Sequence, residues 1–388
     1  MKVGVTLFAQ NYPDWSRFEA LERGESGPDN AGSDARVYQD EIRLGSQIEP
    51  LGFDSIWSVE HHFTPYTMVT NVLQFLSFWA GRTERVGLGT MVAVIPWHNP
   101  IRLAEDIVML QHLLNGRELR IGFGRGAGRR EFGGLHIPMG ESRERFLEGL
   151  EIIRLAITTE RFAFKGKHFQ VPDVSQREES PTISLRPRPR SVDILDQLYC
   201  AWGSPSTAPI AAQAGLKPLI IPQKSFQEYQ PELAEFNRLR AEAGYAPAGP
   251  GLVTWVFCAE NEAEAEAGAR LYMGEYATSA ARHYEFFSGH FATTKGYEHY
   301  AELSKLMSNV PASSFGEIFL KDHIWGTPEQ CMRRLKTANE FMRPSEFIGV
   351  MYGGMAIDVA EKSMRLFAKE VLPFAHELPA ASPVAVTA

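Results

Sequence analysis

The chain has 388 residues, of which 44% are hydrophobic and 11% aromatic, so it can bury the core of one large domain or two ordinary ones. Its formal net charge of −8 argues against a nucleic-acid partner, and no apolar run is long enough to span a membrane. Cys200, Cys258 and Cys331 are far apart in the sequence, which argues against a disulfide framework. They fit a reducing cytoplasm, and the strand-like N-terminal segment has no signal-peptide pattern, so a cytoplasmic location is expected.

Strand and helix patterns alternate along most of the chain. Strand-like runs are expected at 2–8, 55–60, 85–95, 119–123, 198–203, 218–221, 252–258 and 347–352. Helical spacing recurs between them, as in the apolar stripe of Leu103, Ile107, Leu110 and Leu114. About eight β/α units at this length favour a closed (β/α)8 TIM barrel over an open doubly wound sheet.

Three segments interrupt the alternation and are expected to be insertions after strands 1, 4 and 7 of the barrel. They cover 13–36, 165–191 and 274–324. The first and third are long insertions of the kind that usually lies over the active-site face of a barrel. One barrel domain is expected over residues 1–376, followed by a flexible tail at 377–388 that is rich in Ala and Pro.

The run Glu60-His61-His62-Phe63 ends the second predicted strand. Two adjacent imidazoles beside a carboxylate, where a strand gives way to a loop, indicate a reaction centre. Histidine has an unperturbed pKa near neutrality, so it can both take and give a proton at working pH. The alternative is that one of the two histidines only braces the loop.

A candidate phosphate site follows the fifth predicted strand. The strand ends at Gly203, and Ser204 can cap a helix that has Pro205 at its first position. The free backbone N–H groups of the first turn, with the hydroxyls of Ser206 and Thr207, would bind phosphate. A well-capped helix without a ligand is the alternative.

Arg125 lies between two glycines after the fourth predicted strand. A barrel brings the ends of strands four and five together, so this permanent charge supports the same phosphate site. A surface arginine in a tight turn is the alternative. Tyr352-Gly353-Gly354, after the eighth strand, is a rival phosphate site, because barrels often bind phosphate there.

Aromatic residues at strand ends could form a flat wall for a planar cofactor or a substrate. Six of them fall at or near predicted strand ends: Trp57, Trp97, Phe123, Trp202, Trp255 and Tyr352. Gly89, inside the apolar third strand, marks close approach by a ligand or by another backbone. Ordinary core packing is the alternative for the aromatic residues.

Several motifs, in the right order, resemble bacterial luciferase and its flavin-dependent monooxygenase relatives. They lie at 60–63, 88–106, 116–126, 326–329, 353–355 and 363–367. Apart from the insertions, the resemblance runs from residue 2 to about residue 374. It implies a (β/α)8 barrel that binds reduced FMN from a separate flavin reductase. With O2, the protein would oxidise a small organic substrate, apolar or carbonyl-containing.

The resemblance also implies roles for individual residues. His61 would exchange protons at the active site, with Glu60 and His62 positioning it. The FMN phosphate would be held by Arg125, Ser204 and Thr207, and Met91 and Val92 would lie behind the flavin ring. Gly89, Gly203 and Ser206 are further cofactor-binding candidates. In the family, the peptide bond at the position of Met91 and Val92 is commonly cis. A homodimer without a metal is expected.

The chain departs from bacterial luciferase at Met91 and Val92, which replace alanines, and at Trp97 and Trp202, which replace small residues. A different substrate is therefore expected, and light emission is not inferred.

Three other functions stay open. An oxidoreductase using the deazaflavin F420, from the same superfamily, would show other phosphate contacts or a longer groove for the cofactor tail. A non-catalytic flavin-binding protein is disfavoured because His61 and Arg125 are present. A metal-dependent barrel hydrolase could use His61 and His62, but further ligands at strand ends are not evident.

Overall fold

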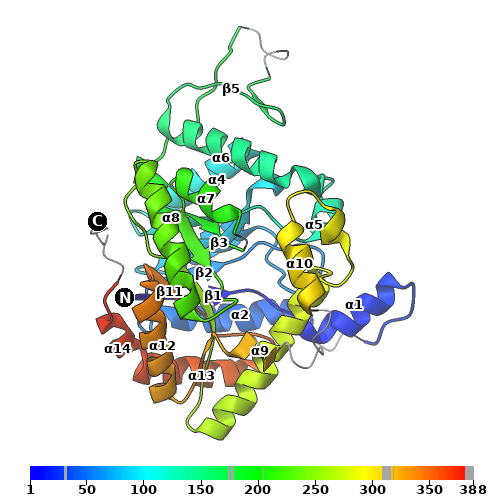
Figure 1. Cartoon of the computed structure of the whole chain (residues 1–388), viewed down its shortest axis with the longest axis vertical. Helices are drawn as coiled ribbons and strands as arrows, with labels where there is room; N and C mark the ends of the chain where they lie inside the picture. Colours follow the sequence, from blue (N-terminus) through cyan, green and yellow to red (C-terminus); the bar gives the residue numbers. More distant parts are fainter. Residues whose placement is uncertain are drawn as a thin grey trace.

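The structure, a computed structural model, describes residues 1–29, 33–173, 175, 179–203, 205–307, 316–317 and 319–380. Eight parallel strands form a closed barrel, and their order around it follows the chain (Figure 1). They are β1 (Lys2–Leu7), β2 (Ser55–Ser58), β3 (Gly87–Val94), β4 (Leu119–Gly124), β7 (Leu198–Ala201), β8 (Lys217–Ile220), β9 (Gly251–Cys258) and β11 (Glu346–Val350). Because β11 pairs with both β9 and β1, the barrel closes, and the predicted TIM barrel is confirmed.

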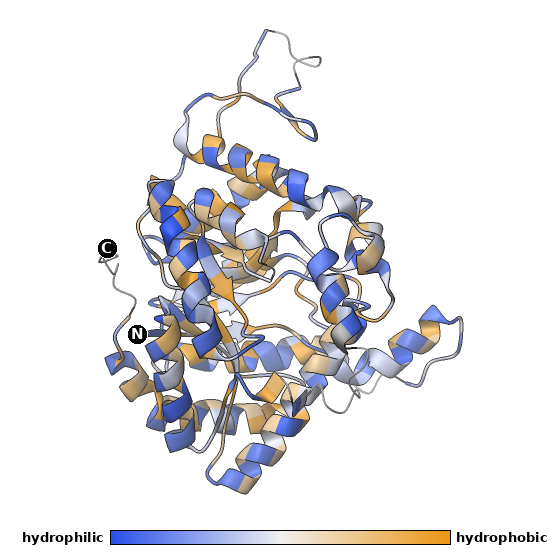
Figure 2. Ribbon diagram, viewed as in Figure 1, coloured by the Kyte–Doolittle hydropathy of each residue, from blue (hydrophilic) through white to orange (hydrophobic). Residues whose placement is uncertain are grey.

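Helices surround the strands. They are α2 (Asp34–Ile48), α3 (Val72–Ala80), α4 (Pro100–Leu113), α6 (Ser142–Thr158), α7 (Thr207–Gln213), α8 (Gln230–Glu242), α12 (Pro328–Met342), α13 (Ile357–Glu370) and α14 (Leu372–Glu377). The start of α4 shows how the sequence sets an end: the Asn99 side chain accepts hydrogen bonds from the N–H groups of Ile101 and Arg102, and Pro100 follows it. The predicted apolar stripe on α4 is buried. Figure 2 shows hydrophobic strands in the centre and helices with hydrophilic outer faces.

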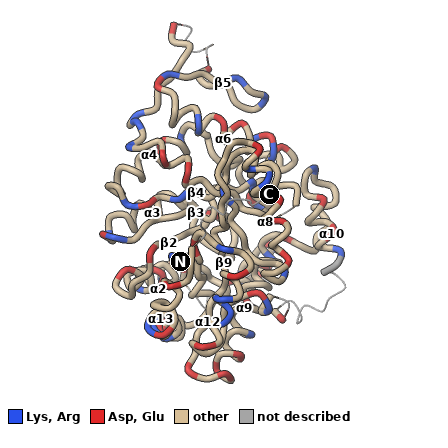
Figure 3. The backbone as a smooth tube through the Cα atoms, turned by 60° about the vertical axis from the view of Figure 1, so that its left-hand side comes forward, with Lys and Arg blue, Asp and Glu red and all other residues tan. Residues whose placement is uncertain are grey.

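Short 3-10 helices link several of these elements: η2 (Ile95–Trp97), η3 (Met139–Glu141), η4 (Val192–Gln197) and η5 (Phe226–Tyr229). The short helix α5 (Arg129–Gly134) follows β4 and was not predicted. Lys, Arg, Asp and Glu are interspersed along the backbone (Figure 3). No helix among the described residues has the length and apolar content needed to cross a bilayer.

The barrel interior is packed at its N-terminal end. A side chain on Gly4 or Gly89 would collide with the indole of Trp57, which is fully buried and donates from Nε1 to Ser55 Oγ at 2.9 Å. Gly89 was predicted to lie beside a ligand and Trp57 beside a substrate. The structure differs: the glycine makes room for the indole inside the barrel.

Phe123 also differs from its predicted place. A side chain on Gly122 would meet Leu219 of β8, which is not a neighbour of β4, so Gly122 faces the barrel interior. Side chains alternate along a strand, so Phe123 faces the surrounding helices. It is fully buried there and forms part of the core.

The insertions have structure of their own. The first contains η1 (Tyr12–Asp14) and α1 (Trp15–Glu22), and the second contains the antiparallel pair β5 (Phe164–Lys165) and β6 (Gln170–Val171). The third contains η6 (His290–Thr293) and α10 (Glu298–Met307), and β10 (Ile324–Gly326) joins the edge of β9. It follows the helix α9 (Glu262–His283), so its predicted start at Gly274 is wrong, because that residue lies inside α9.

The first insertion packs against α9 on one side of the barrel, where Figure 1 also places α5 and α10. The Trp15 indole N–H donates to Ser279 Oγ of α9 at 2.6 Å, and both groups are buried. The predicted tail begins at residue 377, which is the last residue of α14, and residues 381–388 of it lie outside the described part of the chain.

Candidate active site

His61 lies in the loop after β2, and a buried carboxylate holds it. Its Nδ1 atom is 3.0 Å from Glu131 Oε1, and the backbone N–H of His62 donates to the same oxygen at 2.9 Å. Burial raises the pKa of Glu131, but the imidazoles of His61 and His283 outweigh this and bring the pKa to about 2. Glu131 is therefore a carboxylate, which can only accept, so His61 donates from Nδ1 and keeps the Nε2 lone pair free of this bond.

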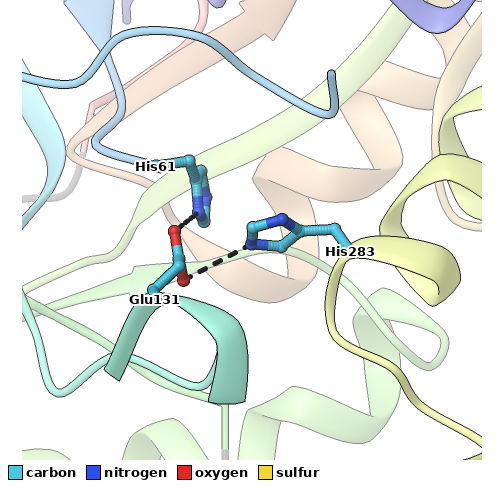
Figure 4. A group of neighbouring side chains, drawn as sticks. All are labelled: His61, Glu131 and His283. Atoms are coloured by element: carbon cyan, nitrogen blue, oxygen red, sulfur yellow. Dashed lines mark hydrogen bonds and ion pairs between the residues drawn. The ribbon is translucent and has the colours of Figure 1, made fainter. Parts of the chain in front are cut away.

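A second histidine completes this cluster. His283, the last residue of α9, has its Nε2 atom 3.4 Å from Glu131 Oε2 (Figure 4). Its Nδ1 atom is 2.7 Å from Thr64 Oγ1. Its ring stacks on Tyr66 at a centroid distance of 4.7 Å. Burial lowers the pKa of His283, although the Glu131 carboxylate opposes this shift. Residues from three distant segments thus meet at the C-terminal ends of the barrel strands.

Glu60 was predicted to position His61, and the structure shows a different arrangement. Among the described residues its carboxylate contacts His62 Nε2 at 3.4 Å, His98 Nε2 at 2.8 Å and the backbone N–H of Val94 at 2.8 Å. Burial raises the pKa of Glu60, and the bonds from His62 and His98 outweigh this, so the pKa is lowered. Glu60 therefore fixes His62 and the end of β3, while Glu131 fixes His61.

Sequence reasoning missed Glu131 and His283. Functional residues of a barrel usually lie at the C-terminal ends of its strands, and Glu131 follows a glycine-rich turn at the end of β4. The short helix that carries Glu131 was not predicted. His283 belongs to a buried stripe on α9, with Met273, Tyr276 and Ser279, at helical spacing. A histidine within this otherwise buried stripe is the sequence signal that could have identified His283 as a functional residue.

The predicted phosphate residues meet beside a second arginine. The Arg125 guanidinium lies over the Tyr297 ring, 4.0 Å from its centroid, and donates to Gly296 O at 2.8 Å. Arg143 of α6 donates to Ser206 Oγ at 3.1 Å. Burial lowers the pKa of Arg143, and the neighbouring charge of Arg125 lowers it further. Two guanidinium groups this close favour a bound anion.

The other residues of this site lie next to α7. The helix begins at Thr207, later than predicted, and Ser204 lies outside the described residues. A side chain on Gly203 would collide with the Tyr300 hydroxyl, which comes from α10. Sequence reasoning missed Arg143 and Tyr300, because both come from elements other than the strand ends themselves.

The rival phosphate site after β11 has different surroundings. A side chain on Gly354 would meet Tyr12 and the Glu275 carboxylate, and burial raises the pKa of Glu275. A carboxylate at this position disfavours phosphate. The site that contains Arg125 and Arg143 is therefore the better anion site.

The peptide bond between Met91 and Val92 is cis, as the resemblance implied. The Val92 side chain fills the space above Gly124, and Met91 Sδ is 3.5 Å from Thr6 Oγ1. Trp97 lies edge-on to His62, with ring centroids 5.3 Å apart. These residues connect the histidine loop to the strand on which a flavin ring is predicted.

The remaining aromatic residues are divided between two places. Trp202 packs on Phe236 of α8, with centroids 5.3 Å apart, which is on the helix side. Trp255 packs on Tyr276 at 3.9 Å, and its buried indole N–H has no hydrogen-bond partner among the described residues. Tyr352 is buried at the end of β11, and burial raises its pKa.

The side-chain amide of Gln10 lies beside this second place. Both of its polar atoms are buried and have no hydrogen-bond partner among the described residues. Its oxygen and the Trp255 indole nitrogen both lie close to Gly353, which has no side chain. Unpaired buried groups of this kind fit a polar ligand at the barrel mouth.

The segments that follow the strands of this (β/α)8 barrel carry an arginine pair and a histidine–carboxylate pair. Residues 19–342 match the model of the luciferase-like monooxygenase family. The chain therefore belongs to that family.

Two relatives of known sequence are similar to this chain. Uncharacterized protein y4wF of Sinorhizobium fredii is 34% identical over 163 residues, which cover 40% of this chain and 47% of that protein. The matched stretch is thus less than half of that relative. An alkanal monooxygenase alpha chain of Photorhabdus luminescens is 22% identical over 97% of this chain and 98% of its own length.

Solved structures share the fold. Monooxygenase RslO1 from Streptomyces bottropensis has a TM-score of 0.75 at 22% identity, covering 96% of this chain and 99% of that one. The oxygenating constituent of 3,6-diketocamphane monooxygenase from Pseudomonas putida, solved with FMN, has a TM-score of 0.69 at 19% identity, covering 98% and 99%. An F420-dependent secondary alcohol dehydrogenase has a TM-score of 0.65 at 14% identity, covering 96% and 98%. At these identities the likeness is one of fold.

Proposed function

We propose that this chain is the oxygenase of a two-component FMN-dependent monooxygenase. It would bind reduced FMN and use O2 to oxidise a small organic substrate, apolar or carbonyl-containing. The observation that carries the proposal is the anion site of Arg125, Arg143 and Ser206, which shares the barrel mouth with the His61–Glu131 pair. This chemistry needs two features from the protein: a site that binds the cofactor phosphate and a group that transfers a proton.

The residues present fit the cofactor. Two guanidinium groups and the Ser206 hydroxyl match a phosphate, with Thr207 and Gly203 beside them. Ser204 keeps its predicted role here as a proposal. The ring would lie against Met91 and Val92, and when bound, reduced FMN supplies the electrons for the reaction with O2.

His61 would move a proton at Nε2. Glu131 holds the Nδ1–H, so the ring presents a fixed Nε2 lone pair, and the carboxylate stabilises the imidazolium that forms when that atom is protonated. General acid–base catalysis of this kind contributes about 10²–10⁴-fold in rate. Glu60 and His62 would support the loop that carries His61.

The third insertion would keep water out of the anion site. The Tyr297 hydroxyl donates to Gly126 O at 2.6 Å and lies 3.0 Å from Ser142 Oγ, so η6 and α10 are fastened to the loop after β4. Tyr300 lies over Gly203. Exclusion of water strengthens electrostatic contacts and suppresses side reactions at the site.

The partners follow from the same proposal. A flavin reductase would supply reduced FMN transiently, and the substrate and O2 would enter the same mouth. A homodimer is expected, and light scattering of the purified protein would test it directly.

The experiment supplies photoreduced FMN and oxygen to the protein with a panel of aldehydes and ketones. Incorporation of one atom from ¹⁸O2 into the product supports the proposal. Oxidation that requires reduced F420 and proceeds without O2 would contradict it and favour the F420 oxidoreductase. Tight binding of oxidised flavin without O2-dependent turnover would favour a non-catalytic flavin-binding protein.

A further inference from the structure

The cluster of His61, Glu131 and His283 has the chemistry of a metal site. Two imidazoles and one carboxylate each offer a ligand atom, and these atoms all lie within 4.8 Å of one another. Figure 4 shows both imidazole rings directed at the Glu131 carboxylate. The three side chains come from three different segments of the chain. Further ligands near His61 are not evident in the sequence, because Glu131 and His283 reach it only through the fold.

Two atoms of the cluster lack a hydrogen bond. Glu131 Oε2 and His283 Nε2 are buried and, among the described residues, have no hydrogen-bond partner, although they are 3.4 Å apart. Buried polar atoms in native structures are almost always paired. A cation between the carboxylate and the imidazole would satisfy both atoms at once.

The contacts around the cluster hold it in a form that can ligate. Thr64 Oγ1 lies 2.7 Å from His283 Nδ1, so a proton on Nδ1 leaves the Nε2 lone pair directed at Glu131. The stacked ring of Tyr66 fixes the plane of this imidazole. Metal-ligating histidines usually make such a hydrogen bond through their other ring nitrogen.

We propose that His61, Glu131 and His283 bind one divalent transition-metal ion of the Zn²⁺ type. Two nitrogen ligands and one oxygen suit Zn²⁺ and Co²⁺, whereas Mg²⁺ and Ca²⁺ prefer oxygen alone. Three protein ligands leave a coordination position open for water. The His61 side chain is 15% exposed, which gives the ion a route from solvent.

Occupancy by such an ion would have two consequences. The ion would take His61 Nδ1 in place of its proton, so the neutral ring would carry its one proton on Nε2 and lose the Nε2 lone pair that the proposed proton transfer uses. It also ties the end of α9 to the loops after β2 and β4. The site therefore makes metal an inhibitor, and its metal affinity can be measured whether or not the proposed function holds.

The test titrates untagged, chelator-treated protein with Zn²⁺ by calorimetry and with Co²⁺ by visible absorption. One ion per chain is expected, with affinity roughly 100-fold weaker or more in Glu131→Gln and His283→Gln, since even outer contacts of a metal site are worth 10–100-fold. His112→Ala is the matched control, because this exposed histidine bonds Arg188 O far from the cluster, and it should leave affinity unchanged.

Three outcomes would overturn the proposal. The first is that the protein does not bind Zn²⁺ at micromolar concentration. The second is that Glu131→Gln and His283→Gln bind Zn²⁺ as tightly as the unmodified protein. The third is that millimolar Mg²⁺ competes with Zn²⁺ for the site. If His283→Gln does not fold, as judged by circular dichroism, Glu131→Gln decides alone because it keeps the shape of the side chain. Zn²⁺ should also raise the Tm of the unmodified protein and leave that of Glu131→Gln unchanged.

Discussion

The two ends of the barrel both bury charged groups, but they hold them differently. At the N-terminal end, Arg120 Nε lies 3.1 Å from Glu346 Oε2, and Glu346 also accepts from Ser55. These residues all belong to barrel strands. At the C-terminal end, the charge of Glu131 is held by His61 and His283, which come from a loop and from the end of α9.

The difference separates stability from chemistry. Charges on paired strands are fixed by the backbone ladder and cannot move without opening the barrel. Charges on loops and surrounding helices are held by contacts between distant segments, and one of these residues, His61, reaches solvent. Substitutions at the N-terminal end should therefore change folding, and substitutions at the C-terminal end should change function.

The largest effect is expected for His61→Ala. We expect a folded protein that still binds FMN and loses about 10²–10⁴-fold in coupled substrate oxidation, with release of hydrogen peroxide. Steady-state turnover and peroxide yield measure this. His62→Ala is the matched variant and should reduce turnover less and stability more. Near-normal turnover in His61→Ala with none in His62→Ala would mean that the other histidine is the reactive one.

Arg120→Met tests the N-terminal end. Removing one partner of a buried ion pair leaves Glu346 uncompensated, which typically costs about 3–5 kcal/mol of unfolding free energy. Urea unfolding measures the loss. The double variant with Glu346→Gln should recover part of it, because the stranded charge is gone. A variant with unchanged stability but impaired turnover would break the comparison between the two ends.

Glu41 is an exception that sharpens the comparison, because it lies at the C-terminal end of β1 and its substitution should still change stability. This buried carboxyl has no cation beside it among the described residues. It accepts from the N–H groups of Phe8 and Ala9, and burial raises its pKa from 4.5 to about 7. Between these pH values the folded state binds more protons than the unfolded state, so this group's contribution to stability falls as pH rises. The difference between the two pKa values corresponds to a change of about 3 kcal/mol in the free energy of unfolding.

Glu41→Gln should remove that pH dependence. Denaturant unfolding of both proteins at several pH values between 4.5 and 7 measures it. The stability of the unmodified protein, relative to the variant, should decrease across this window and stay constant above it. A difference that is independent of pH would show that Glu41 is ionised throughout.

The smallest effect is expected for Arg125→Ala. Loss of a charge-assisted phosphate contact costs about 1.5–3 kcal/mol, so FMN affinity should fall while the chemical step changes little. Fluorescence titration of FMN measures the affinity. Arg102→Ala, at an exposed position paired with Glu105, is the control. Unchanged FMN affinity in a folded Arg125 variant would remove this arginine from the site.

The sequence predicted the barrel well because alternation of strands and helices is a local pattern. It also placed His61 and Arg125 at strand ends, where the structure has them. It could not find the partners Glu131 and His283, because a contact between distant segments depends on how loops and insertions fold. The sequence also could not distinguish Trp57, which faces the barrel interior, from Trp202, which faces a helix. A shift of one residue along a strand moves a side chain to the opposite face of the sheet.

The hydrogen bond between the Trp15 indole and Ser279 has a consequence for protein engineering. It makes α1 and α9 a single module, although most of the barrel separates them in the sequence. A chimera that takes only one of these helices from a relative would leave a buried indole N–H without its acceptor, which costs about 1–3 kcal/mol. Exchange of both helices together keeps the bond, so recombination libraries for altered substrate range should treat residues 13–22 and 262–283 as one cassette.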